Sequence, residues 1–325
     1  MVDFQLSRNV PESPFRVKTA EKANPDLLRR VRTLEEHSEQ LIRAIKEQTG
    51  WEEVDFSDLE VVVAPPRCFR NRYLEQFADC SKLGLEEKIS LGIRAWYFQF
   101  SILGACIFDA NQVMLNSYFV SYRPPISILE TLCHELIHYS QHKRFKQFFA
   151  LQGQLRQALK IRPESKDDWL EFERLYKLIV GREAWMEAHA EYLSYLIIKD
   201  FETLLPKTRF TRLHRFSELI IFSLRSIIEP ETTFELEAER AALSLIEHYC
   251  GQPYNRKFVD LMFENPCLID VLFQPHGTLD IPVPDQLSHE ETKKLVNDLI
   301  SFRPDKGKAI TSGQLTINLS GRSLF

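Results

Sequence analysis

The sequence lacks a long apolar run, has no closely spaced cysteine pair and contains only 11 glycines in 325 residues. Because a membrane-spanning helix needs ~20 apolar residues, none is expected. The N-terminal segment has no apolar core of a Sec signal, so we expect a cytoplasmic protein; non-classical secretion would leave no comparable pattern. The six cysteines form no CxxC pair, which argues against a zinc ribbon and against a disulfide-rich secreted scaffold.

The chain also lacks a strong charge of either sign. Its net charge of −5 gives no overall attraction to nucleic acid or to anionic lipid, so we expect neither a nucleic-acid partner nor a membrane. Residues 207–216 are basic with interleaved aromatics, but an apolar run follows them, which favours a solvated amphipathic helix. No pattern predicts an oligomeric state.

Long stretches with apolar residues at helical spacing predict an α+β fold that is predominantly helical. Residues 58–64 are typical of a strand. Residues 104–120 are typical of a β-hairpin around the turn residues Asp109 and Asn111. The expected helices are 24–49, 84–100, 127–159, 165–199, 207–229, 233–249 and 255–273, with a further one capped by Ser288 and Glu291.

These elements predict two regions. Residues 1–200 would form one domain with the N-terminal helix, the small sheet and the helices that carry the candidate site. Residues 201–325 would form an all-helical C-terminal region with a partly irregular tail, in which the segment TINLS at 316–320 is a candidate edge strand.

The segment TLCHELIHYS, residues 131–140, holds two histidines four positions apart. A capping-box pattern at Ser127 and Glu130 predicts a helix start just before them. On a helix, His134 and His138 lie on one face ~6 Å apart, so both imidazoles can reach one Zn²⁺ ion. Glu135 lies about 100° around the helix, where it can take a proton from a water that zinc activates. A chance HExxH is the alternative, but uncharged neighbours disfavour an ordinary solvated helix.

A catalytic zinc site needs a third protein ligand. His142 shares the face of the two histidines, but it lies ~11–12 Å along the axis from His134, so the three imidazoles cannot readily meet at one ion. Residues 181–200 carry carboxylates at four-residue spacing among apolar residues, where a cation would explain the like charges. The candidates are Glu183, Glu187 and Glu191.

Three segments resemble zincin metallopeptidases over about residues 100–195. TLCHELIHY resembles the long HExxH signature, with Ser140 where a hydrophobic residue is usual. GACIFDANQVMLN resembles the hairpin that precedes this helix in small zincins of the ImmA/IrrE type. The segment from Glu187 to Glu191, EAHAE, is similar to the glutamate helix of gluzincins.

The resemblance implies a zincin-like core and a zinc metallopeptidase of the gluzincin type, with one Zn²⁺ per chain. It implies that the metal ligands are His134, His138 and Glu187, and that Glu135 is the catalytic base. Glu191 would then orient a ligand histidine. The substrate would be a peptide or protein segment that pairs with the hairpin edge at about 113–116.

Two further features stay open. A donor to the oxyanion is needed, and the candidates are Arg182, His189, Tyr192, Tyr195 and His214. The alternative function is a catalytically inactive or regulatory zincin-fold protein that binds a partner or ligand, and an intact Glu135 favours the enzyme over it. Cys133 adjoins His134, but we expect its thiol in the core rather than as a nucleophile.

Overall fold

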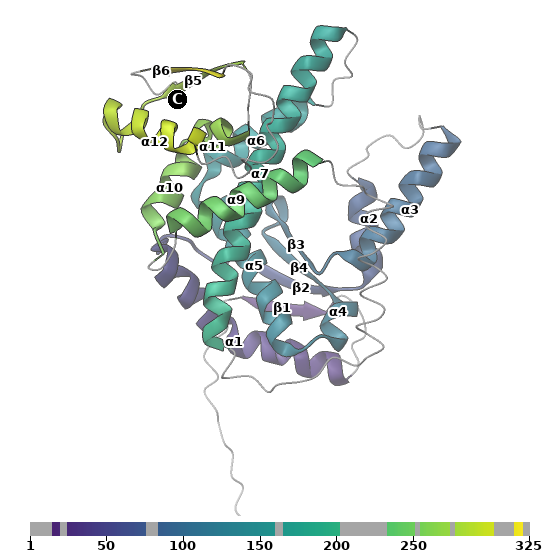
Figure 1. The fold of residues 1–325 in the computed structure, drawn as a ribbon. Coiled ribbons are helices and arrows are strands. Elements are labelled where there is room, and N and C mark those ends of the chain that lie inside the picture. Colours follow the sequence, from purple (N-terminus) through teal and green to yellow (C-terminus); the bar gives the residue numbers. More distant parts are fainter. Residues whose placement is uncertain are drawn as a thin grey trace, which may run out of the picture. The chain divides into compact units, whose positions relative to one another are not determined.

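The structure of the chain is a computed structural model. It describes residues 15–19, 25–75, 84–159, 165–201, 233–250, 254–273, 277–301 and 315–320. The described chain is predominantly helical with a small mixed sheet, which confirms the coarse fold class (Figure 1). The predicted helix 207–229 and the candidate His214 lie outside the described residues.

The chain divides into two compact units. The first contains residues 1–47, 51–139 and 196–229, and the second contains 48–50, 140–195 and 230–325. Two of the limits between them fall inside continuous helices, α5 (Pro125–Arg144) and α7 (Lys166–Phe201), and none falls at residue 200. The division of the chain into domains at residue 200 stays a prediction.

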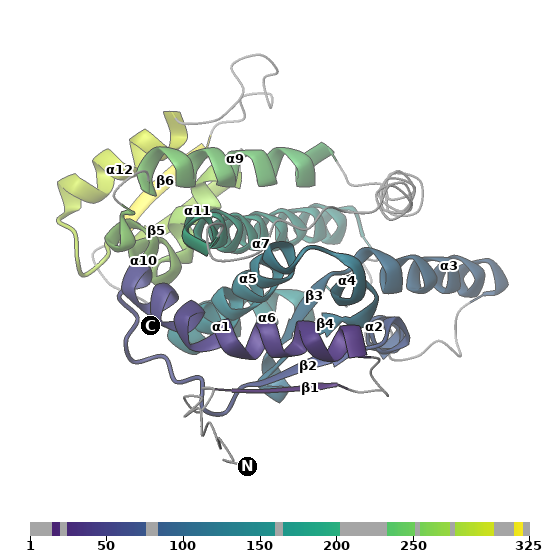
Figure 2. The same cartoon turned by 90° about the horizontal axis from the view of Figure 1, so that it is seen from below.

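The first unit is built on a four-stranded sheet of order β1-β2-β4-β3 (Figure 2). β1 (Arg16–Thr19), β2 (Glu60–Ala64) and β4 (Gln112–Asn116) run parallel, and β3 (Gly104–Ile107) is antiparallel to β4. The predicted hairpin is therefore confirmed. Its turn is a short 3-10 helix, η2 (Phe108–Ala110), followed by Asn111 in the left-handed region at φ 48°. Asn tolerates this conformation better than most residues.

The hairpin ends earlier than predicted. Asn116 caps a short helix, α4 (Ser117–Tyr122), by accepting a hydrogen bond from the Tyr118 N–H. The same buried side chain donates to the carbonyl oxygens of Gln99 (2.8 Å) and Ile102 (3.0 Å). A strand thus becomes a helix at Asn116, because its carboxamide satisfies the helix start and also holds the segment that precedes β3.

Alternation along the strands gives the sheet two buried faces. On one face, residues of β2, β3 and β4 pack against α2 (Pro66–Glu75) and α3 (Leu85–Ser101) through a cluster around Ala64, Phe69 and Met114. On the other face, Gly104 lies against the side chains of α5. The first long helix of the unit is α1 (Pro25–Thr49), as predicted; neither α2 nor β1 was predicted.

The second unit contains most of the remaining helices. They are α6 (Lys146–Ala158), most of α7, α9 (Thr233–Cys250), α10 (Arg256–Glu264), α11 (Pro266–Phe273) and α12 (His289–Ser301). The predicted capping box is present, since the Ser288 hydroxyl and the Glu291 carboxylate bond each other's backbone N–H. The predicted helix 255–273 is two helices, because Pro266 starts a new one after Asn265.

The C-terminal region is not all helical, which corrects the prediction. β5 (Gly277–Pro282) and β6 (Leu315–Ser320) pair in parallel as a two-stranded sheet. β6 contains the candidate strand TINLS. β5 was missed because only two residues, Leu279 and Ile281, supply its buried face, and prolines follow it closely.

A buried ion pair joins α7 to α11 within the second unit. The Arg182 guanidinium donates to both carboxylate oxygens of Asp270, at 2.8 and 2.7 Å, and both side chains are buried. Gly181, the residue before Arg182, lies so close to Phe273 that a Cβ at this position would meet the ring at 2.3 Å. The two helices can approach this closely because residue 181 is glycine.

Within the described residues, the structure holds no helix that is both long and apolar enough to cross a membrane.

Candidate metal centre

The helix that carries the HExxH segment starts two residues earlier than its capping-box pattern predicts. α5 begins at Pro125, a position where the fixed φ and missing N–H of proline cost little. The Ser127 hydroxyl instead accepts a hydrogen bond from the Arg123 guanidinium. The predicted Ser127 cap is therefore wrong, although the helix through residues 131–140 is confirmed.

The two histidines of α5 turn their rings toward the same point. Their Nε2 atoms are 2.9 Å apart, and the ring planes lie at 81° to each other. His138 is buried and His134 is half-buried. Two nitrogens bound to one tetrahedral zinc at ~2.0–2.1 Å would lie ~3.3 Å apart. The distance between the two Nε2 atoms would therefore need to increase by only a few tenths of an ångström for both to bind one ion.

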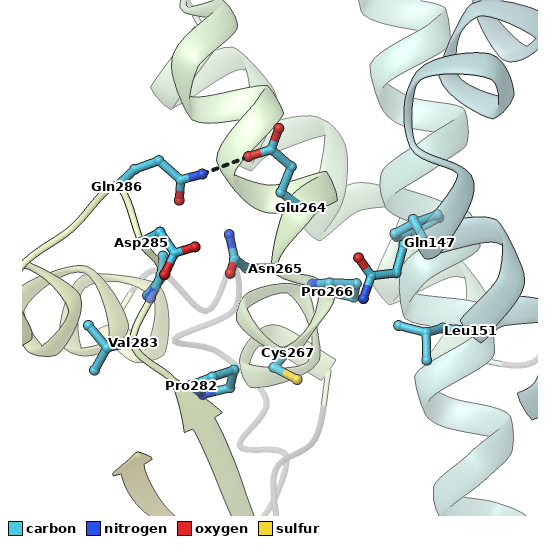
Figure 3. A pocket seen from close by; sticks show the side chains of 12 residues that line it. Gln147, Leu151, Glu264, Asn265, Pro266, Cys267, Pro282, Val283, Asp285 and Gln286 are labelled. Carbon is cyan, nitrogen blue, oxygen red and sulfur yellow. Dashed lines mark hydrogen bonds between the residues drawn. The ribbon is translucent and has the colours of Figure 1, made fainter. Parts of the chain in front are cut away.

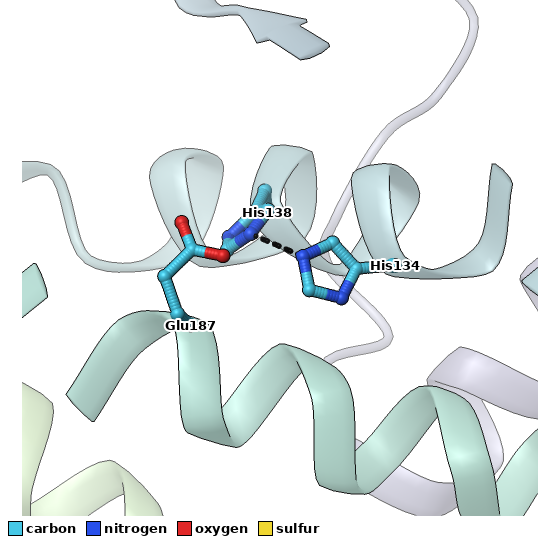
Figure 4. A group of neighbouring side chains, drawn as sticks. All are labelled: His134, His138 and Glu187. Carbon is cyan, nitrogen blue, oxygen red and sulfur yellow. Dashed lines mark hydrogen bonds between the residues drawn. The ribbon is translucent and has the colours of Figure 1, made fainter. Parts of the chain in front are cut away.

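Glu187 of α7 is the candidate for the third ligand, and its carboxylate lies near both imidazoles. One atom each from His134, His138 and Glu187 lie within 4.8 Å of one another (Figure 4). The other two candidate carboxylates of α7 are placed differently. Glu183 accepts hydrogen bonds from Arg156 (2.6 Å) and Gln152 (3.2 Å). The third, Glu191, is exposed.

The register of α5 on α7 is held by a buried side chain that sequence reasoning missed. The Gln141 carboxamide donates to the Met186 carbonyl oxygen (3.1 Å) and to Nδ1 of His189 (2.8 Å). Gln141 lies three residues after His138 on a continuous helix, and the two acceptors flank Glu187 in sequence. The contact therefore fixes the two helices at the turns that carry the candidate ligands.

His189 continues this contact to Tyr254 within the second unit. Because its Nδ1 accepts from Gln141, we assign its proton to Nε2, which faces the Tyr254 hydroxyl. Both nitrogens of the fully buried ring are thus engaged. His189 holds α7 in place and is not positioned as an oxyanion donor. In the sequence alone, the only indication of this role was that Gln141 lies about one turn after His138.

The candidate base lies against the end strand of the sheet. Glu135 is 8% exposed. A Cβ added to Gly104 of β3 would lie 3.0 Å from its Cγ and 3.1 Å from its Oε1. Burial, with a smaller effect of the Glu135 charge, raises the pKa of the neighbouring Cys106 thiol well above its usual value. Burial likewise raises the pKa of Cys133, which keeps that thiol protonated and unsuited to nucleophilic attack.

The candidates for the oxyanion donor are reduced to two among the described residues. Arg182 is bound to Asp270, and His189 is engaged on both nitrogens. Tyr195 is 60% exposed. Tyr192 is half-buried, and burial raises the pKa of its hydroxyl. A tyrosine hydroxyl is protonated at neutral pH in any case and can donate a hydrogen bond.

The donor set fits zinc. Two imidazoles and one carboxylate match the ligands of catalytic zinc sites, which keep a further position for water or substrate. The exposure of Glu187 is consistent with such an open site. Comparison with protein-family models, with curated proteins and with solved structures found no match to this chain.

We expect purified protein to contain about one zinc per chain and expect His138→Ala and Glu187→Gln to lose it, because each removes one of three ligands. Elemental mass spectrometry after dialysis measures the metal content. Glu191→Gln is the matched control, since it removes the same charge one turn further along α7. Equal zinc loss in Glu187→Gln and Glu191→Gln would show that charge alone, not ligation, holds the metal.

We expect Gln141→Leu to weaken zinc binding about tenfold or more, because the helices that carry the ligands lose their buried tie; changes beside metal ligands typically cost 10–100-fold. Competition with a chromogenic chelator measures the dissociation constant. Gln154→Leu, at an exposed position of α6, is the control. Lower thermal stability with an unchanged zinc affinity would mean that Gln141 serves folding alone.

Proposed function

We propose that this protein is a zinc-dependent metallopeptidase that hydrolyses peptide bonds. The observation that supports this most strongly is the approach of His134, His138 and Glu187, whose candidate ligand atoms lie within 4.8 Å of one another. The three come from two helices separated in sequence by α6. A chance HExxH in an ordinary helix gives no reason for a carboxylate from another helix to meet both imidazoles.

The chemistry divides between the metal and Glu135. Bound zinc would lower the pKa of water to ~7 and polarise the scissile carbonyl. Glu135 directly follows a ligand histidine, and its carboxylate is largely shielded from solvent. In this position it would accept the proton of the attacking water and deliver it to the leaving amine.

The sheet offers a place for an extended substrate, but not where the sequence resemblance implied. Residues 113–116 belong to β4, which pairs with β2 on one side and β3 on the other, so that expectation is wrong. β3 is the end strand of the described sheet, and Gly104 places it against Glu135. A peptide added as a strand to the outer edge of β3 would therefore pass beside the base.

We expect Glu135→Gln to lower peptide hydrolysis by about 10²–10⁴-fold, because a carboxamide cannot accept the proton, while zinc content stays unchanged. The zinc-loaded protein is incubated with a mixed peptide library, and new termini are identified by mass spectrometry. Glu130→Gln, an exposed change on the same helix, is the control. Zinc without cleavage in the wild type would instead support a binding or regulatory protein.

We expect Gly104→Ala to lower turnover about tenfold, because its methyl group would displace Glu135 by a few tenths of an ångström and catalysis is sensitive to such shifts. Zinc content should not change. Gly92→Ala is the matched control, since a Cβ there meets nothing within 4 Å. Wild-type turnover in Gly104→Ala would argue against a base held by β3.

A further inference from the structure

A cavity of about 280 Å³ opens within the second unit (Figure 3). Its walls come from α6, from the junction of α10 and α11, and from the segment that follows β5. The polar lining residues are Gln147, Glu264, Asn265, Asp285 and Gln286, and the less polar ones are Phe148, Leu151, Pro266, Cys267, Pro282, Val283 and Pro284.

Three prolines stiffen two of the walls. Pro266 starts α11, and Pro282 and Pro284 flank Val283 after β5. Each proline fixes its own φ, so the backbone here has little freedom to close the cavity. On the remaining side, Phe148 and Leu151 project from a regular helix. The cavity is therefore preformed, which lowers the entropic cost of binding a ligand.

The polar groups of the cavity are two carboxylates and three carboxamides. The Gln286 carboxamide donates to Glu264 Oε2 (2.8 Å), and the Asn265 carboxamide donates to the Leu261 carbonyl oxygen (2.9 Å). Each bond uses one of the two N–H groups of its carboxamide, so one N–H and the amide oxygen of each side chain remain. No hydrogen bond or ion pair to another described residue engages the Asp285 carboxylate. The exposed carboxylates of Glu264 and Asp285 accept hydrogen bonds only, so they favour a ligand that carries donors and a positive charge.

The charge around the cavity also favours a cation. Among the described residues, no Lys, Arg or His lines it. Outside the lining, Arg144 Nη2 lies 3.7 Å from Glu264 Oε1 and 3.9 Å from Asp260 Oδ2, so one guanidinium faces two carboxylates there. Burial and the Asp260 charge together raise the pKa of Glu264. The negative charge at this carboxylate is thus only partly compensated, and a second cation would stabilise it.

We propose that this cavity binds a guanidinium group on an apolar stem, as in an arginine side chain. A guanidinium is planar, carries five N–H donors and has no acceptor, which matches the unused oxygens. The stem would lie along Phe148 and Leu151. A bare Ca²⁺ ion fits less well, because it needs 6–8 oxygen ligands at 2.3–2.6 Å and gains nothing from apolar walls. This site does not depend on the proposed peptidase activity.

Isothermal titration of the zinc-loaded protein with N-acetyl-arginine amide tests the proposal. The neutral isostere N-acetyl-citrulline amide should bind at least tenfold more weakly, since hydrogen bonds between charged groups are the stronger ones. Asp285→Asn should weaken binding of the arginine amide about tenfold. Glu290→Gln removes the same charge from an exposed position of α12 and should leave it unchanged. Arg144→Gln should strengthen binding, because Glu264 then has no competing guanidinium.

Three results would overturn the proposal. Equal binding of the arginine and citrulline amides would show that charge is not recognised. An unchanged affinity in Asp285→Asn would place the ligand elsewhere on the protein. Saturation by Ca²⁺ with no binding of the arginine amide would make this a metal site. If the proposal holds, titration with agmatine distinguishes two classes of natural ligand. Binding as tight as that of the arginine amide indicates a small guanidine, and much weaker binding indicates an arginine side chain of a peptide.

Discussion

The candidate centre depends on the hydrogen bonds that the buried Gln141 carboxamide makes to α7. A metal site formed by two helices needs their register fixed to a fraction of an ångström, and apolar packing alone specifies register poorly. Gln141 bonds Met186 and His189 on either side of Glu187, and it lies one turn after His138. Leaving either partner unsatisfied in a buried position would cost roughly 1–3 kcal/mol, so few other registers are accessible. The polar contact therefore provides the specificity that the metal centre requires.

A second constraint acts from the sheet. Gly104 lets β3 approach α5 so closely that the Glu135 side chain is held between strand and helix. The strand that ends the described sheet thus lies directly against the candidate base. Asn116 strengthens this arrangement, since its side chain holds the end of α3 and the start of the β3 segment together. Short local contacts thus bring the proposed substrate edge and the candidate base to one place.

The sequence predicted the elements that depend on local residue spacing. It did not predict the features that depend on contacts between distant segments of the chain. The helix through His134 and His138 and the hairpin before it follow from periodicity and turn residues. The position of the sheet's free edge does not follow from periodicity. β4 is an inner strand only because β2, about 50 residues earlier in the chain, pairs with it. Glu187 was singled out by a resemblance, and its nearness to the histidines depends on packing. The role of Gln141 was not predicted, because no sequence pattern identifies a buried glutamine until its hydrogen-bond partners on another helix are known.

The two candidate sites differ in the ligand atoms they present, and this difference separates their ligands. The centre on α5 offers imidazole nitrogens with a single carboxylate, a set that suits zinc and offers little to an organic cation. The cavity beside α6 offers carboxylate and amide oxygens with apolar walls, a set that suits a guanidinium and lacks the nitrogens that zinc prefers. Zinc and a guanidinium ligand should therefore not compete for one site. If both proposals hold, Arg144 links them in the chain, since it ends the helix of the histidines and already neutralises part of the charge at Glu264.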